Sequence, residues 1–102
     1  MNDPISKNTT VVAVKDQVWC ELTGEAVILH LKSSVYYGLN PVGARVWSLI
    51  QESKTVGAVL NTLLNEYDVA AERCEVDLLE LLKELKSREL IEVEPNTHGA
   101  IE

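Results

Sequence analysis

The stretch YYGLNPVGARVW, residues 36–47, changes the chain from a strand to a helix within a few residues. It opens on two tyrosines, which are typical of strands. Asn40 can cap a helix with its side-chain oxygen, and Pro41 suits the first helical position because it has no N–H to leave unpaired. Val42 and Val46 then begin the spacing of one buried helix face. The stretch therefore predicts a strand that passes directly into a helix.

The residues before this stretch predict an antiparallel meander. Apolar runs cover residues 18–22, 25–32 and 35–39, and polar turns separate them. Thr23 and Gly24 make a two-residue connection, in which Gly24 supplies the positive φ that a hairpin turn needs. Residues 10–14 are expected to form a short leading strand.

The residues after the stretch predict three helices in all. The first should fade near Glu52. The second has Thr55 as its N-cap and should end near Asp68, and the third should cover residues 71–88 with leucines along one face. The order of three strands followed by three helices predicts one α+β domain over residues 10–94. Residues 1–9 and 95–102 are expected to be flexible.

The composition argues for an acidic, cytoplasmic protein. The 102 residues carry a formal charge of −7, and an acidic surface repels phosphate backbones, so a nucleic-acid partner is disfavoured. No apolar run is long enough to span a membrane, and residues 1–10 lack the apolar core of a signal peptide. We therefore expect no membrane partner.

No set of residues predicts a metal site, a cofactor site or an active site. Cys20 and Cys74 lack the paired spacing of metal ligands, so both are interpreted as small buried hydrophobic residues. His30 continues the alternation of a strand and should either pack or face solvent. Ser33, Ser34, His30 and Asp77 have no spacing that suggests a nucleophile with a base. The chain is therefore expected not to be an enzyme, and its function should lie in a surface.

Two surfaces are candidates for binding a partner. Residues 35–37 lie in the last strand of the meander and form a free edge with no proline or charge to block another strand. Core and rim packing is the alternative explanation of the two tyrosines, and for Tyr37 it is at least as good as contact with a partner. On the third helix, Val76 and Leu79 lie to the side of the core stripe, near Lys83. Either this helix buries both of its sides, or these residues form the wall of an open groove.

Several motifs together resemble the PqqD-like family, whose members are also called RiPP recognition elements. The Tyr-Tyr-Gly-Leu-Asn-x-x-Gly-Ala-x-x-Trp pattern of residues 36–47 is the most specific. Residues 55–56 at the start of the second helix, residues 67–69 at its end, and the pattern of Asp77 with Leu78, Leu81, Leu82 and Leu85 also match. The resemblance covers roughly residues 17–93.

The resemblance implies a winged-helix-like fold and a non-catalytic role. Members of this family bind the leader of a ribosomally made precursor peptide as an extra strand, in the groove between the third strand and the third helix. The matching positions here are Ser34, Val35, Tyr36 and Tyr37 for the strand edge. The facing wall would be formed by Val76, Leu79 and Lys83, or by the opposite flank at Asp77 and Leu81.

The chain most resembles the stand-alone B1 proteins of lasso-peptide pathways. That resemblance implies a leader peptidase, and possibly a cyclase, as further partners. Where the family often has Gly after the third helix, this chain has Glu89, which puts a left-handed helix stop in doubt there.

A winged-helix transcriptional regulator is the alternative, because the order of helices is compatible with one. Such a protein needs a basic recognition helix. The predicted third helix mixes Lys83, Lys86 and Arg88 with Glu80 and Glu84, which is typical of an ion-paired, solvated face.

Overall fold

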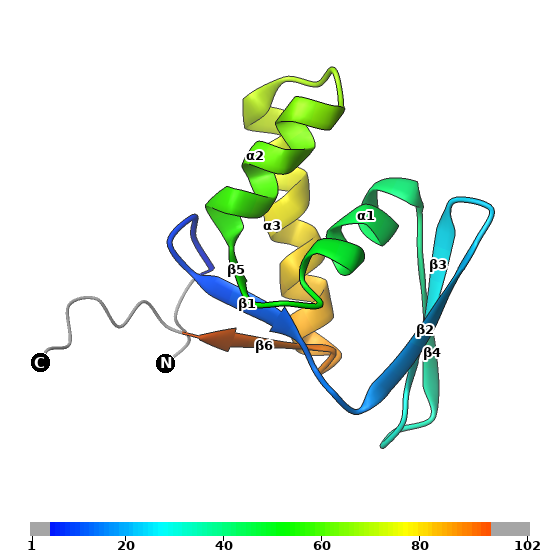
Figure 1. Cartoon of the computed structure of the whole chain (residues 1–102). Coiled ribbons are helices and arrows are strands. Elements are labelled where there is room, and N and C mark those ends of the chain that lie inside the picture. The colour runs from blue at the N-terminus through cyan, green and yellow to red at the C-terminus, as the bar shows by residue number, and fades with distance from the viewer. Residues whose placement is uncertain (1–4, 95–102) are drawn as a thin grey trace, which may run out of the picture.

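The computed structural model describes residues 5–94, which form two three-stranded antiparallel sheets and three helices (Figure 1). The α+β class is confirmed. Figure 1 shows the sheet of β2, β3 and β4 at one side, α2 and α3 at the other, and α1 between them. The elements in chain order are β1 (Thr10–Ala13), β2 (Gln17–Leu22), β3 (Glu25–His30), β4 (Val35–Leu39), α1 (Pro41–Leu49), β5 (Lys54–Thr55), α2 (Val56–Glu66), α3 (Ala71–Ser87) and β6 (Ile91–Glu94).

The predicted meander is present as the sheet β2-β3-β4. The two-residue loop between β2 and β3 has positive φ at both residues, 50° at Thr23 and 85° at Gly24, which is the type I′ geometry that matches the twist of a hairpin. Ala26, Ile28 and His30 of β3 are buried. The sheet therefore presents one face to the core and the other to solvent.

The structure also contains a second three-stranded sheet, with the order β5-β1-β6, which the sequence did not predict. The leading strand does not join the meander. Its central residues Val11 and Val12 pair instead with Val93 and Glu92 of β6, and Thr10 pairs with Thr55 of β5. These partners are far apart in sequence, so no local pattern indicates the pairing.

The start of α1 agrees with its sequence signals. The N–H of Gly43 donates to the side-chain oxygen of Asn40 at 2.8 Å, and Pro41 is the first helical residue. The helix ends at Leu49, earlier than predicted. Trp47 of this helix is fully buried and belongs to the single described core.

The C-terminal end of α3 has the left-handed stop that the sequence put in doubt. Glu89 has φ 61°, and the N–H of Leu90 donates to the carbonyl of Leu85 at 3.0 Å, as in a Schellman motif. The helix closes in this way although a non-glycine residue pays a conformational cost in the left-handed region. Glycine is therefore not required at this position.

The core extends beyond the predicted domain start at residue 10. Ile5 and Thr9 are buried, and the N–H of Gly57 donates to the carbonyl of Lys7 at 3.0 Å. Residues 5–9, expected to be flexible, thus pack on the domain, while residues 1–4 and 95–102 lie outside the described part.

The interpretation of Cys20 as buried was wrong, because it lies on the exposed face of β2. Cys74 is half-buried, and both thiols are free.

Candidate functional site: the groove between β4 and α3

The strand β4 lies at an edge of its sheet. It pairs with β3 on one side, and no strand among residues 5–94 pairs with its other side. Val35 and Tyr36 are exposed, with 69% of the Tyr36 surface open to solvent. Unpaired backbone groups on such an edge can accept an additional strand.

The register of the meander decides which backbone groups of β4 face the open edge. Leu22 and Glu25 flank a two-residue loop and therefore form a hydrogen-bonded pair. Every second residue of β3 from Glu25 onward then bonds to β2, and the residues between them bond to β4. Tyr36 and Gly38 are paired with those residues of β3 that bond to β2. Their own N–H and C=O groups therefore point away from β3, to the open edge.

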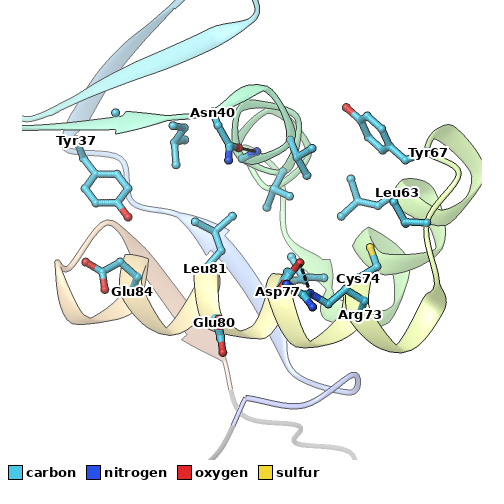
Figure 2. A pocket seen from close by; sticks show the side chains of 17 residues that line it. Tyr37, Asn40, Leu63, Tyr67, Arg73, Cys74, Asp77, Glu80, Leu81 and Glu84 are labelled. Atoms are coloured by element: carbon cyan, nitrogen blue, oxygen red, sulfur yellow. Dashed lines mark hydrogen bonds and ion pairs between the residues drawn. The ribbon is translucent and has the colours of Figure 1, made fainter.

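A cavity of about 590 Å³ lies between this part of β4 and helix α3 (Figure 2). Its volume is within the range of ligand-binding clefts. Strand β4 contributes Tyr37, Gly38 and Leu39, and α3 contributes residues from Arg73 to Glu84. The open edge and the cavity are thus parts of the same groove.

The middle and far end of the cavity are mainly apolar. Figure 2 shows the side chain of Leu81 rising from α3, with Leu63 and Tyr67 at the end formed by α2 and the loop after it. The apolar side chains in this part of the cavity come from four segments of the chain. They belong to Val42 and Val46 of α1, Leu63 of α2, Val69 of the α2–α3 loop, and Leu78 and Leu81 of α3.

Polar groups surround Tyr37 at the other end of the cavity. Figure 2 shows its ring over α3, near Glu84. The Arg88 guanidinium lies 5.0 Å from the centre of the ring and bonds to the Glu84 carboxylate at 2.7 Å. Burial, and then the charge of Glu84, raise the pKa of Tyr37. The phenol therefore stays neutral near pH 7 and can donate or accept a hydrogen bond.

Two of the eight residues predicted for peptide binding line the cavity, Tyr37 from β4 and Asp77 from α3. Asp77 forms an ion pair with Arg73 at 3.3 Å. Ser34 lies in the turn before β4 with φ 60°, and Val35 and Tyr36 follow it on the exposed part of the strand.

The other three predicted residues, Val76, Leu79 and Lys83, are not among those that line the cavity. At about 100° per residue they lie on the opposite flank of α3 from Asp77 and Leu81. Val76 is 52% exposed, and Leu79 packs against the core. The cavity is thus on the flank of Asp77 and Leu81.

Sequence reasoning missed the cavity residues that come from α1 and α2. Their apolar spacing indicated only a buried helix face, and nothing in it distinguishes a core position from a cavity wall. Cys74 was also missed, and Figure 2 shows its sulfur toward the cavity. Burial, and then the charge of Asp77, raise the pKa of this thiol.

Within residues 5–94 no group of three or more His, Cys, Asp or Glu side chains is arranged to hold a metal ion. In the same range, none of the helices has the length and apolar character needed to cross a membrane.

Comparison with known proteins identifies the family. A family model described as coenzyme PQQ synthesis protein D (PqqD) matches residues 25–91, which is more than half of the chain. A solved structure of TbiB1 in complex with the TbiA(beta) leader peptide matches with a TM-score of 0.74 and 34% sequence identity, over 79% of this chain and 94% of that chain. No curated protein sequence matches. As the motif in residues 36–47 predicted, the chain belongs to the PqqD family.

Proposed function

We propose that this chain binds the leader region of a ribosomally synthesised precursor peptide, as a strand added to β4 in the groove beside α3. The observation that carries the proposal is the open edge of β4 along a cavity of about 590 Å³ whose wall is mainly apolar. The similarity to TbiB1, a protein solved with a leader peptide, supports the same role.

Backbone hydrogen bonds and apolar contacts in the groove can together support binding near micromolar affinity. Tyr36 and Gly38 present four backbone groups, and at about 1 kcal/mol each these contribute about 4 kcal/mol. Micromolar binding requires about 8 kcal/mol. Apolar leader side chains that enter the cavity would contribute about 1.5–3 kcal/mol each, so two of them supply much of the remainder.

The proposed role is one of recognition and delivery rather than catalysis. The chain would hold the leader while a separate enzyme acts on the precursor. From the resemblance to stand-alone B1 proteins, we infer that these enzymes are the leader peptidase of a lasso-peptide pathway and, after it, the cyclase.

The test is a titration of the isolated protein into the fluorescein-labelled leader of the precursor peptide encoded beside it, followed by fluorescence anisotropy. Saturable binding at micromolar concentration or below is expected, and a scrambled leader of the same composition should bind far more weakly. Absence of saturable binding to a folded sample would refute the proposal. A gel-shift experiment at low salt tests the regulator alternative, which requires sequence-dependent DNA binding.

A further inference from the structure

The imidazole of His30 connects two turns that are far apart in the sequence. His30 is the last residue of β3 and is only 7% exposed. The backbone N–H of Ser33 donates to its Nδ1 at 3.3 Å, and its Nε2 lies 3.1 Å from the carbonyl oxygen of Glu89. One bond is thus made within the β3–β4 turn, and the other reaches the end of α3.

These two partners determine the tautomer of the ring. A backbone N–H only donates, so Nδ1 must be the acceptor for Ser33. A carbonyl oxygen only accepts, so Nε2 must carry the proton that is donated to Glu89. Both bonds exist together only in the neutral form protonated at Nε2.

Each of the two turns leads directly to a wall of the groove. Ser34, with φ 60°, precedes β4, and Glu89, with φ 61°, follows α3. The contact of Arg88 with the Tyr37 ring links the same strand and helix. The strand and the helix are therefore linked twice, through Tyr37 with Arg88 and through His30. The Arg88 side chain is partly exposed, whereas His30 is buried.

We propose that His30 is a positioning residue of the groove: it holds the turn before β4 against the turn after α3 and so sets the separation of the two walls. This inference rests on the proposed function, because the separation matters to a strand that must lie about 4.8 Å from β4 and still fit beside α3. His30 is not among the residues that line the cavity and acts through its neighbours.

Two conservative variants separate the two bonds of His30. In His30→Asn the side-chain oxygen can replace Nδ1 and accept from Ser33, but nothing reaches Glu89. In His30→Gln the longer amide can replace Nε2 and donate to Glu89. We expect His30→Asn to bind the labelled cognate leader about tenfold more weakly than the wild type, and His30→Gln to remain within about threefold.

Recovery of leader binding by His30→Gln, but not by His30→Asn, is a readout that a general loss of stability would not reproduce. Urea denaturation of both variants shows whether the binding differences follow stability. Equal weakening of the two variants, or wild-type affinity in folded His30→Asn, would overturn the inference.

A measurement without leader separates this inference from the proposed function. Spin labels at Tyr36→Cys and Glu80→Cys, with Cys20 and Cys74 changed to Ser, report the distance between the walls. His30→Asn should broaden or lengthen this distance, and His30→Gln should not. If the distance changes as expected but the wild type binds no leader, the positioning role stands and the leader proposal fails. An unchanged distance in His30→Asn refutes the positioning role.

Discussion

The flank of α3 that contacts a leader can be identified with one pair of substitutions, Leu81→Gln and Val76→Gln. Leu81 lines the cavity and is half-buried, whereas Val76 lies on the other flank and is 52% exposed. Gln is a good helix former, so neither change should disturb α3 greatly. The two variants introduce the same amide on opposite sides of one helix.

The expected magnitude follows from what happens to each amide when the leader binds. At residue 81 the bound peptide would cover the amide without offering it a partner, which costs about 1–3 kcal/mol in proteins. The dissociation constant should therefore rise by about fivefold at the low end of this range and by about a hundredfold at the high end. The amide at residue 76 stays in water, so the affinity of Val76→Gln should stay within about twofold of wild type.

The assay is anisotropy of the labelled cognate leader, with urea denaturation to show that each variant is folded at the assay temperature. A larger loss of leader affinity in Val76→Gln than in Leu81→Gln would refute the assignment of the binding groove to the flank of Asp77 and Leu81. Wild-type affinity in folded Leu81→Gln would refute it as well.

Three further predictions concern the elements that hold the groove. Asn40→Ala removes the cap of α1 and should lower the free energy of unfolding by about 1 kcal/mol, whereas Asn40→Asp should retain most of it, as measured by urea denaturation. Thr23→Asn suits the type I′ turn better than a β-branched residue with φ 50° and should raise the midpoint of thermal unfolding by several degrees; no increase would contradict the assigned turn. Because burial and Glu84 raise the pKa of Tyr37, the unfolded chain loses this proton first as pH rises. Stability should therefore fall above about pH 10, and Tyr37→Phe should reduce that fall in urea denaturation at about pH 9 and about pH 11.

The local signals of the sequence predicted the local structure well. The strand-to-helix passage at Asn40 and Pro41, the hairpin at Gly24 and the cap at Thr55 each depend on a few neighbouring residues, and all are present. The left-handed stop at Glu89 shows the limit of such signals, because packing there holds a residue whose intrinsic preference is different.

Features that depend on distant contacts were not predictable. The pairing of β1 with β6 joins opposite ends of the domain, and β5 has only two residues. Alternation along β2 separates Cys20 from Trp19 but does not say which of them faces the core. In the same way, the leucines of α3 define a stripe without showing how the helix is rotated against β4. The sequence therefore did not decide which flank of α3 faces the groove, and in the structure it is the flank that carries Leu81.

The most direct test of strand addition compares prolines at the two edges of the same sheet. Tyr36→Pro removes an N–H that points to the open edge of β4. Glu21→Pro removes an N–H that points to the open edge of β2, because Glu21 is paired with Ala26, whose backbone bonds to β4. Neither change removes a donor from the β2-β3-β4 ladder. We expect Tyr36→Pro to weaken binding of the cognate leader at least about tenfold and Glu21→Pro to leave it within about twofold. Equal affinity of the two folded variants would contradict leader binding at β4.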